Sequence, residues 1–463
     1  MFLYLPVFFT NYPILNSKTE YIFLLLLISL VLLICIVITK TSSPKIYLID
    51  FACYKPPTSQ MCSKEFVLNH VTRHNKHISK EMLDFIKKAF ERCGLGDSTY
   101  LSEIFFEQSY KPSLKDATRE VEMAIFGSVD MLMAKTGIRC EDIGILVVNC
   151  CIYNTMPSLS GMIVNRYRLR DNTITYNLSG MGCSAGLLAI GLAKQLLQVH
   201  QNSYALIVST ESLTENYYLG LDRSKQFINF LFRVGGAAIL LSNHPSDYKI
   251  SKYQLLHEIH TNTSCSDRSY NCILREEDAA GIVGVTINKD LLAAAIATIK
   301  PNVTTVGYLI LPVKEKLFYL VTYITRILIP LVKISQYIPN YSTSVDHFLP
   351  HVGGKPVLDE LQKTLGFSEE DMEASRMTLY RYGNTSSSSI WYELAYVEAK
   401  GWVKKGNRVW QIAFGSGFKC NSVIWQATKT VDHDDHNPWT DEIDQFPVSR
   451  KDMEPFPVYF KPS

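Results

Sequence analysis

The sequence Gly-Met-Gly-Cys-Ser-Ala-Gly occupies residues 180–186, with its cysteine at position 183. Residues 173–178 before it are predicted to form a strand, and residues 183–199 an amphipathic helix. Small residues on both sides of Cys183 allow a tight turn and the close approach of a substrate. A thiol at the start of a helix faces the positive end of the helix dipole, which favours the nucleophilic thiolate. Cys183 is therefore a candidate nucleophile, and a buried structural cysteine packed between glycines is the alternative.

Strands and helices are predicted to alternate along most of the chain after residue 46. Short apolar runs are predicted to be buried strands, at 143–148, 204–209, 237–241 and 409–414. Helices are predicted at 114–135, 159–167, 357–365 and 387–398. This alternation predicts an α/β fold built of layered helices and sheets. A strand, a turn with a reactive side chain and a helix occur around both Cys183 and Asn384, which indicates two related halves.

Two histidines stand close together before a Gly-Gly turn. His347 and His351 are four residues apart, a spacing at which one helix presents two metal ligands. Pro350 lies between them and disfavours a continuous helix. A catalytic or a structural role is therefore expected for His351 in place of metal ligation.

Two polar or glycine-rich loops are further candidates for a site. Asn384 precedes one threonine and a run of serines. Two interpretations of this loop are possible: it caps the helix that follows, or it holds the carboxamide of Asn384 so that it donates to a developing oxyanion. The residues Gly415, Ser416 and Gly417 follow a predicted strand. They lack the pattern of a phosphate-binding loop, so backbone N–H groups that face an active site are the better interpretation.

The chain is apolar and free of charge from Tyr21 to Ile38, which is long enough to cross a hydrocarbon core of about 30 Å. Lys40 and Lys45 follow it, so a membrane anchor with the C-terminal part in the cytosol is predicted. A cleaved signal peptide is the less favoured alternative, because no small-residue cleavage site follows. A second apolar stretch, 317–334, contains Arg326, which makes a membrane span costly. Two interpretations stay open for it: a core helix, or an amphipathic helix on a membrane surface or over an acyl tunnel.

Composition excludes some classes of protein. The formal net charge of the 463 residues is only +2, so no nucleic-acid partner is expected. The 11 cysteines are an odd number and show no pairing pattern, which indicates free thiols in a reducing compartment.

Taken together, a cysteine, a histidine, an asparagine and a glycine loop in this order resemble the thiolase superfamily. The chain resembles in particular the plant 3-ketoacyl-CoA synthases of very-long-chain fatty acid elongation. Segments that match this family are found at 50–56, 94–97, 142–149, 157–160, 232–238 and 401–404. The resemblance covers nearly the whole chain beyond the anchor and implies a thiolase-like fold.

The resemblance also implies roles for single residues. Cys183 matches the family's nucleophile, His351 its catalytic histidine and Asn384 its catalytic asparagine. The implied reaction transfers an acyl group from acyl-CoA to Cys183 and then condenses it with malonyl-CoA, with loss of CO2, to 3-ketoacyl-CoA. His351 and Asn384 are expected to stabilise the enolate oxygen. The second oxyanion is expected to be stabilised by the backbone N–H groups of Cys183 and of the loop Gly415, Ser416 and Gly417.

Other positions are expected to support the site. His260 and His347 fall on histidine positions of the family, whereas Tyr380 stands where the family usually has histidine. Tyrosine can donate a hydrogen bond but is not cationic near neutral pH. The resemblance implies no metal and no organic cofactor, a homodimer, the reductases and dehydratase of an elongation complex as partners, and the endoplasmic reticulum membrane as location.

The predicted organisation is an anchor at 1–45, a first thiolase-like half at 46–245, a connecting region at 246–345, a second half at 346–430 and a polar surface tail at 431–463. Two alternatives to the elongase function are kept. One is a polyketide synthase-like condensing enzyme, which the anchor disfavours. The other is a weakly active or inactive scaffold subunit of the elongation complex, which Tyr380 keeps open. Acyl chain length and saturation do not follow from the sequence.

Overall fold

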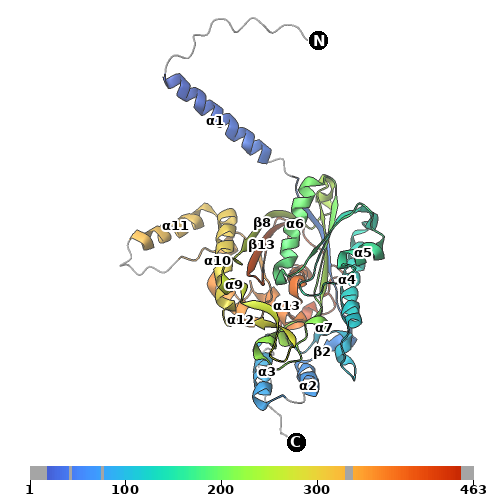
Figure 1. The fold of residues 1–463 in the computed structure, drawn as a ribbon. Helices are drawn as coiled ribbons and strands as arrows, with labels where there is room; N and C mark the ends of the chain where they lie inside the picture. Colours follow the sequence, from blue (N-terminus) through green and yellow to red (C-terminus); the bar gives the residue numbers. More distant parts are fainter. Residues whose placement is uncertain (1–17, 41–43, 75–77, 329–336, 450–463) are drawn as a thin grey trace. The chain divides into compact units, whose positions relative to one another are not determined.

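The computed structural model describes residues 18–40, 44–74, 78–328 and 337–449. The chain divides into two compact units, Met1–Lys45 and Ile46–Ser463. The first unit contains helix α1 (Lys18–Lys40), with described side chains from Tyr21 to Leu33. The second contains all strands of the described chain and the candidate site residues (Figure 1).

A single large sheet runs through the second unit. Its nine strands, within the described residues, follow the order β11-β12-β13-β8-β1-β7-β6-β4-β5. Their bounds are β1 Tyr47–Cys53, β4 Ile143–Asn149, β5 Ile174–Leu178, β6 Tyr204–Thr210, β7 Gly236–Ser242, β8 Tyr253–Asn262, β11 His347–Pro350, β12 Arg408–Gly415 and β13 Lys419–Ala427. Two short sheets pair β2 (Met61–Cys62) with β3 (Thr99–Tyr100), and β9 (Ile273–Glu277) with β10 (Val283–Ile287).

The sheet joins the two sequence halves along one seam. Strands β5, β4, β6, β7 and β1 come from the first half, and β8, β13, β12 and β11 from the rest of the chain. The seam is short, because β1 pairs with β8 only at Tyr47 and Leu48. Strand β4 pairs in parallel with β5 and β6, and β11 with β12, whereas the other pairs are antiparallel.

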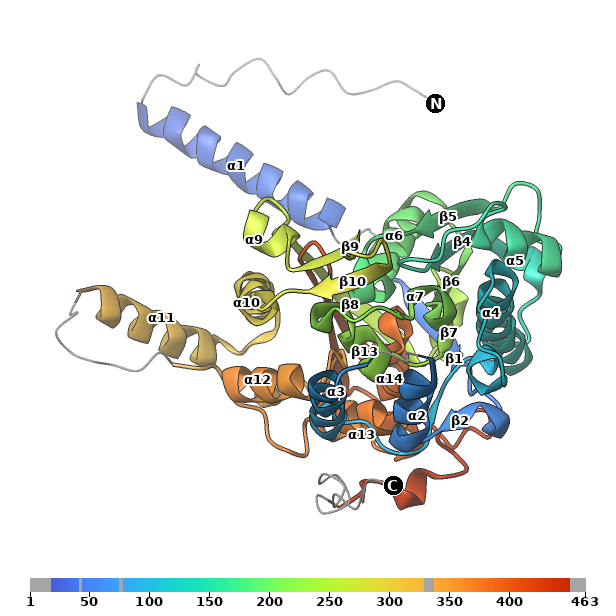
Figure 2. The same cartoon turned by 60° about the horizontal axis from the view of Figure 1, so that its bottom comes forward.

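Helices surround these strands on several sides (Figure 2). Their bounds are α2 Lys64–His74, α3 Lys80–Arg92, α4 Leu114–Thr136, α5 Leu159–Tyr167, α6 Ala185–Val199, α7 Leu213–Asn216, α8 Phe227–Leu231, α9 Asp267–Tyr270, α10 Leu291–Ile310, α11 Val313–Leu328, α12 Lys355–Leu365, α13 Glu373–Tyr382 and α14 Ser389–Ala399. Helix α4 packs on β1, β6 and β7, and α10 packs on β8 and β13. The predicted α/β fold class is confirmed.

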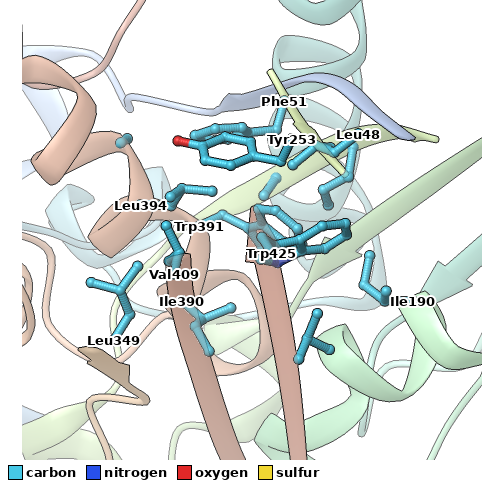
Figure 3. Close-up of a cluster of buried hydrophobic side chains, with 14 of the residues drawn as sticks. Leu48, Phe51, Ile190, Tyr253, Leu349, Ile390, Trp391, Leu394, Val409 and Trp425 are labelled. Atoms are coloured by element: carbon cyan, nitrogen blue, oxygen red, sulfur yellow. The ribbon is translucent and has the colours of Figure 1, made fainter. Parts of the chain in front are cut away.

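Two helices, α6 and α14, lie in the middle of the molecule and contact both halves of the sheet. Helix α6 packs on β4 and β6 and also on β12 and β13, while α14 packs on β1 and β11. Figure 3 shows how their side chains meet in one core: Ile190 from α6 and Trp391 from α14 lie with Phe51 and Trp425 from strands of the two halves. Because both helices are enclosed, their N-terminal ends hold fixed positions in the interior.

Most of the predicted elements are confirmed. Helix α5 has the predicted bounds of 159–167, and β4 and β6 each extend the predicted strand by one residue. The predicted helix at 183–199 begins as a short 3-10 turn, Gly182–Ser184, before α6 proper.

The core-helix interpretation of residues 317–334 is wrong for the residues that the structure describes. Helix α11 covers 313–328 and contains no buried residue. Residues 329–334 of the predicted stretch lie outside the described residues. For residues 317–328, the structure agrees with the interpretation of an exposed amphipathic helix.

The expected surface tail is also wrong where the structure describes it. Trp439 is fully buried in the main core, and its indole N–H donates to the carbonyl of Tyr392 at 2.9 Å. The rings of Tyr382, Tyr396 and Phe446 pack edge-on against it. One large aromatic side chain is therefore enough to draw a mostly polar segment onto the core.

The structure also bears on membrane segments. Among the described residues, one helical stretch is long and apolar enough to cross a membrane by length and composition, Gly182–Val199, and 56% of it is buried, as expected of a core helix. The apolar part of α1 with described side chains, Tyr21–Leu33, is shorter.

Candidate active site

Cys183 lies in the 3-10 turn that leads into α6. Gly182 before it has a φ of +64°, which favours glycine. A Cβ atom at this position would lie 2.5 Å from the backbone nitrogen of Ser416, so the site requires glycine for space as well. Cys183 is half-buried as a residue and forms no disulfide.

The loop that begins at Asn384 contacts this turn. Its backbone is tied to the chain after α8, because Asn384 N–H donates to Leu231 and Arg233 N–H donates to Asn384. The side-chain oxygen of Asn384 accepts the backbone N–H of Ser386 at 2.8 Å. This bond turns the amide NH2 toward Cys183, where it donates to the sulfur and lowers the pKa of the thiol. Asn384 thus organises its own loop, and its role as a donor to a developing oxyanion stays a prediction.

Ser386 is a second donor to the same sulfur. Its hydroxyl lies 3.7 Å from Cys183 Sγ and 3.4 Å from Glu211 Oε2. The residue has a φ of +58°, a left-handed conformation that is costly for a side chain with a Cβ. Strain of this kind is concentrated at functional sites, and here it directs the hydroxyl at the nucleophile.

Glu211 is a buried carboxylate that immediately follows β6. It accepts the backbone N–H groups of Cys151 and Ile152 at 3.0 and 3.2 Å and a contact from the Cys150 thiol at 3.4 Å. Burial raises the pKa of Glu211, and these donors oppose the rise. The carboxylate is therefore held by the loop after β4 and placed behind Ser386.

His351 follows β11 and is fixed through its backbone, since its N–H donates to Ile412 of β12 at 2.9 Å. Its imidazole is buried and packs edge-on against Phe414, with ring centroids 5.6 Å apart. Among the described residues, neither ring nitrogen has a hydrogen-bond partner. Burial alone lowers the pKa of His351 to about 3, so the ring is neutral near neutral pH. A neutral imidazole with two buried, unsatisfied nitrogens is suited to bind a polar ligand atom.

The predicted glycine loop lies against the nucleophile turn. A Cβ atom at Gly415 would lie 2.7 Å from the carbonyl oxygen of Met181 and 3.0 Å from the nitrogen of Cys183. Since Gly415 and Ile412 belong to the same strand, β12 connects this loop with the residue that fixes His351. The turn at Cys183, the loop at Asn384 and the loop at Gly415 therefore lie together, and β12 connects them with the strand that precedes His351.

The expected stabilisation of a thiolate is wrong for the free site. The pKa of Cys183 is raised to about 12, mainly by burial and also by the negative charge of Glu211, although the donors Ser386 and Asn384 lower it. Desolvation outweighs the favourable position at the start of a helix. Cys183, the candidate nucleophile, is therefore a thiol near neutral pH in the free site.

The residues expected to support the site lie farther away. His347 stands at the other end of β11 from His351, about 13 Å along the strand, where burial lowers its pKa and Asn407 and the Trp402 backbone raise it. The ring of Tyr380 lies against Gly96, where an added Cβ would be 2.7 Å from it, and its carbonyl accepts the N–H of Gly96. The supporting roles of His347 and Tyr380 stay predictions.

His260 is connected to the nucleophile helix through one amide. It lies opposite Asn421 in the β8–β13 pair, with Nδ1 2.8 Å from the side chain of Asn421. In the orientation that satisfies both ends, Asn421 donates to His260 and accepts the N–H of Leu188 at 3.1 Å. Leu188 lies in the first turn of α6. His260 is thus linked through Asn421 to the helix that follows Cys183, and its supporting role stays a prediction.

The sequence interpretation missed Glu211 and Ser386. The sequence contains a signal for Glu211, because an acidic residue directly after a buried apolar strand is costly unless it has partners. No local signal separates Ser386 from its neighbouring serines, since its role follows from the conformation of the loop. As for metals, no group of three potential ligands occurs among the described residues.

Comparison with known proteins agrees with this geometry. Residues 37–328 match the model of the FAE1/Type III polyketide synthase-like protein family, and residues 341–427 match the 3-oxoacyl-[acyl-carrier-protein (ACP)] synthase III C-terminal model. The chain is 50% identical over 415 residues to 3-ketoacyl-CoA synthase 2 of Arabidopsis thaliana, a match that covers 88% of this chain and 78% of that protein. The chain belongs to the 3-ketoacyl-CoA synthase family. A second Arabidopsis thaliana member, 3-ketoacyl-CoA synthase 11, is also 50% identical, over 87% of this chain and 79% of its own length.

The thiolase-like fold expected for this family is confirmed by structure. A fungal type III polyketide synthase, ORAS, superposes with a TM-score of 0.65 over 82% of this chain and 99% of its own. The two sequences are 19% identical, so this likeness concerns the fold alone.

Proposed function

We propose that this chain is a 3-ketoacyl-CoA synthase that extends long-chain acyl-CoA by two carbons from malonyl-CoA, the first step of very-long-chain fatty acid elongation. The observation that carries the proposal is the half-buried Cys183, whose thiol contacts Asn384 and Ser386 at the start of a buried helix. Membership of the 3-ketoacyl-CoA synthase family supports it.

In the first half-reaction, the sulfur of Cys183 attacks the carbonyl carbon of the acyl-CoA. The thiol proton passes to the departing sulfur of CoA, and an acyl-cysteine remains. The backbone N–H of Cys183 and those of the loop at Gly415, Ser416 and Gly417 stabilise the tetrahedral oxyanion, a task for which preorganised donors are effective.

In the second half-reaction, malonyl-CoA loses CO2 and becomes the enolate of acetyl-CoA. The N–H of His351 and the amide NH2 of Asn384 donate to the enolate oxygen, a role that suits a neutral imidazole whose pKa is lowered to about 3. The enolate carbon attacks the acyl carbonyl, the bond to sulfur breaks, and Cys183 regains a proton from solvent. The products are 3-ketoacyl-CoA, CO2 and free CoA.

The same proposal places the enzyme on a membrane. Helix α1 comprises 23 residues, enough for about 34 Å at 1.5 Å per residue, and its described side chains from Tyr21 to Leu33 are almost all apolar and exposed. It anchors the chain in the endoplasmic reticulum membrane with the catalytic unit in the cytosol, where the chain works as a homodimer next to the reductases and dehydratase of elongation.

The test uses the full chain in microsomes, with labelled malonyl-CoA and acyl-CoAs of graded length. We expect 3-ketoacyl-CoA products two carbons longer than the starter. The Cys183→Ala variant is expected to lose about 10³-fold or more of this activity and to keep its thermal stability. The control is Cys265→Ala, because Cys265 is an exposed free thiol.

Other outcomes contradict the proposal in different ways. Products from small or aromatic starters alone would indicate a polyketide synthase-like enzyme. Stable protein without any elongated product would indicate the scaffold subunit. Wild-type activity of Cys183→Ala would exclude Cys183 as the nucleophile.

A further inference from the structure

Helix α11 exposes an apolar surface that the rest of the described chain leaves uncovered. It is 16 residues long, none of them buried. Both views show it extending away from the sheet, after the turn that ends α10 (Figures 1 and 2). A helix of a water-soluble domain normally turns its apolar stripe toward the core, so this orientation needs an explanation.

The apolar residues of α11 form one stripe. They recur at the spacing of three and four residues that places side chains on one face of a helix. The residues of this face are Leu317, Leu320, Val321, Ile324, Ile327 and Leu328, and their exposed fractions range from 43% to 72%. We call this set the α11 stripe.

The described contacts of α11 with the returning chain lie on its other face. The hydroxyl of Tyr337 donates to Glu315 at 2.7 Å, and the backbone N–H of Asn340 donates to the same carboxylate at 2.9 Å. The ring of Tyr337 lies 5.9 Å from that of Phe318. At 100° per residue, Glu315 lies opposite the centre of the α11 stripe and Phe318 lies about 120° from that centre. The chain therefore packs on the polar side of its own amphipathic helix and directs the apolar side outward.

The charges of α11 are predominantly positive. It contains Lys314, Lys316 and Arg326 against the single acid Glu315, whose carboxylate is engaged by Tyr337 and Asn340. The two lysines lie over aromatic rings, Lys314 over Phe318 and Lys316 over Tyr308. Cationic and aromatic side chains beside an apolar stripe are typical of helices that lie in the interface of an anionic membrane.

A charge decides between lying on the membrane and crossing it. Arg326 lies within the described helix Val313–Leu328, and a charged side chain in the hydrocarbon core is costly. We infer that α11 lies flat on an anionic phospholipid surface with the α11 stripe inserted, as a second membrane contact besides α1. The inference rests on the membrane location proposed above. Because α11 continues from α10, which packs on β8 and β13, this contact also orients the catalytic unit relative to the bilayer.

The test measures the depth of single positions in the full chain. Leu320→Trp and Thr322→Trp variants are reconstituted in vesicles of phosphatidylcholine with phosphatidylserine, with and without lipids brominated near the top of the acyl chain. The five native tryptophans are accounted for with the parent protein. We expect the Leu320→Trp signal to be quenched about two-fold or more over the Thr322→Trp signal, because an interfacial helix inserts about 5–10 Å on its apolar side only.

Each other outcome has a separate meaning. Equal quenching at both positions, or none at either while the protein remains with the vesicles, overturns the inference but leaves anchoring through α1 intact. Loss of the protein from the vesicles contradicts the membrane location itself. If the Leu320→Trp signal is unquenched and Leu320→Asp lowers the oligomeric state in detergent, the α11 stripe contacts a second copy of the chain and the inference is wrong.

Discussion

The hydroxyl of Ser386 lies 3.7 Å from the sulfur of Cys183, and the backbone at Ser386 is held in a left-handed conformation to place it there. The same hydroxyl lies 3.4 Å from the buried carboxylate of Glu211. The nucleophile is therefore linked through one serine to an acidic group that is held by the loop after β4. Burial raises the pKa of the thiol most, and these two contacts modify it, because Ser386 lowers the pKa whereas Glu211 raises it.

Replacing Ser386 by alanine should slow catalysis and shift its pH dependence. Loss of the donor raises the pKa of Cys183 further, so less thiolate forms at a given pH. We expect kcat to fall about ten-fold. We also expect that Cys183 reacts with iodoacetamide at the wild-type rate only at a higher pH. The matched control is Ser388→Ala, which removes a buried hydroxyl bonded to Thr385 within the same loop. Equal pH profiles for the two variants would show that Ser386 acts only on the loop.

Replacing Glu211 by glutamine should lower the pKa of the Cys183 thiol. The negative charge of Glu211 raises the pKa of Cys183, so the neutral variant is expected to alkylate at lower pH than the wild type. The variant should also lose about 2 kcal/mol of stability, since an amide replaces a carboxylate that accepts two backbone N–H groups. Glu215→Gln serves as the control, because Glu215 is more exposed and pairs with Arg275. An alkylation profile unchanged from wild type would contradict the electrostatic link.

Local patterns predict much of the fold. Helix α5 and strands β4 and β6 were predictable because their apolar spacing is decided by neighbours in the sequence. The order Cys183, His351, Asn384 and Gly415 was likewise visible, since each stands at the end of a predicted element. A buried site assembled from such ends is the expected result of an α/β fold.

The predictions that failed share one physical cause: they depend on which side chains are buried, and burial is decided by parts of the chain that are distant in sequence. Apolar residues at 317–328 suit a core helix and an interfacial helix equally well, and only the structure, in which no residue of the described α11 is buried, distinguishes them. Trp439 is one aromatic residue in a polar tail, and its place in the core depends on rings that lie far away in the sequence. The pKa of Cys183 is dominated by desolvation, which has no signature in neighbouring residues.

A methyl group at Gly415 should disturb the nucleophile turn. The added Cβ would lie 2.7 Å from the carbonyl of Met181 and 3.0 Å from the nitrogen of Cys183, and both neighbours are backbone atoms that cannot rotate away. We expect Gly415→Ala to cost about 1–3 kcal/mol of stability and to lower condensation at least about ten-fold. The control is Gly144→Ala, where the nearest atom would be 3.7 Å away. Full activity of Gly415→Ala would place the oxyanion donors elsewhere.

Acidification should destabilise the protein partly through His351. Burial lowers the pKa of this histidine to about 3 in the folded state, whereas an unfolded histidine has a pKa of about 6.5. Between these values the unfolded chain binds a proton that the folded chain does not, so the free energy of unfolding falls as the pH falls below about 6.5. From pH 7 to pH 5 this contribution is about 2 kcal/mol, at 1.36 kcal/mol for each pH unit below the unfolded pKa.

The His351→Gln variant isolates this effect, because glutamine retains polar groups of similar size but does not titrate. We expect the melting temperature in detergent to drop less between pH 7 and pH 5 for this variant than for the wild type, whatever the two proteins' stabilities at pH 7. The control is His436→Gln, at an exposed histidine whose side chain is 57% accessible. The pH response of this variant should follow that of the wild type.

His70, also buried with a pKa lowered to about 4, adds the same kind of acid sensitivity and leaves a residual drop of the melting temperature in both variants. A parallel pH response of His351→Gln and wild type would mean that the imidazole titrates in the folded enzyme as it does in the unfolded chain, which would contradict the lowered pKa of His351.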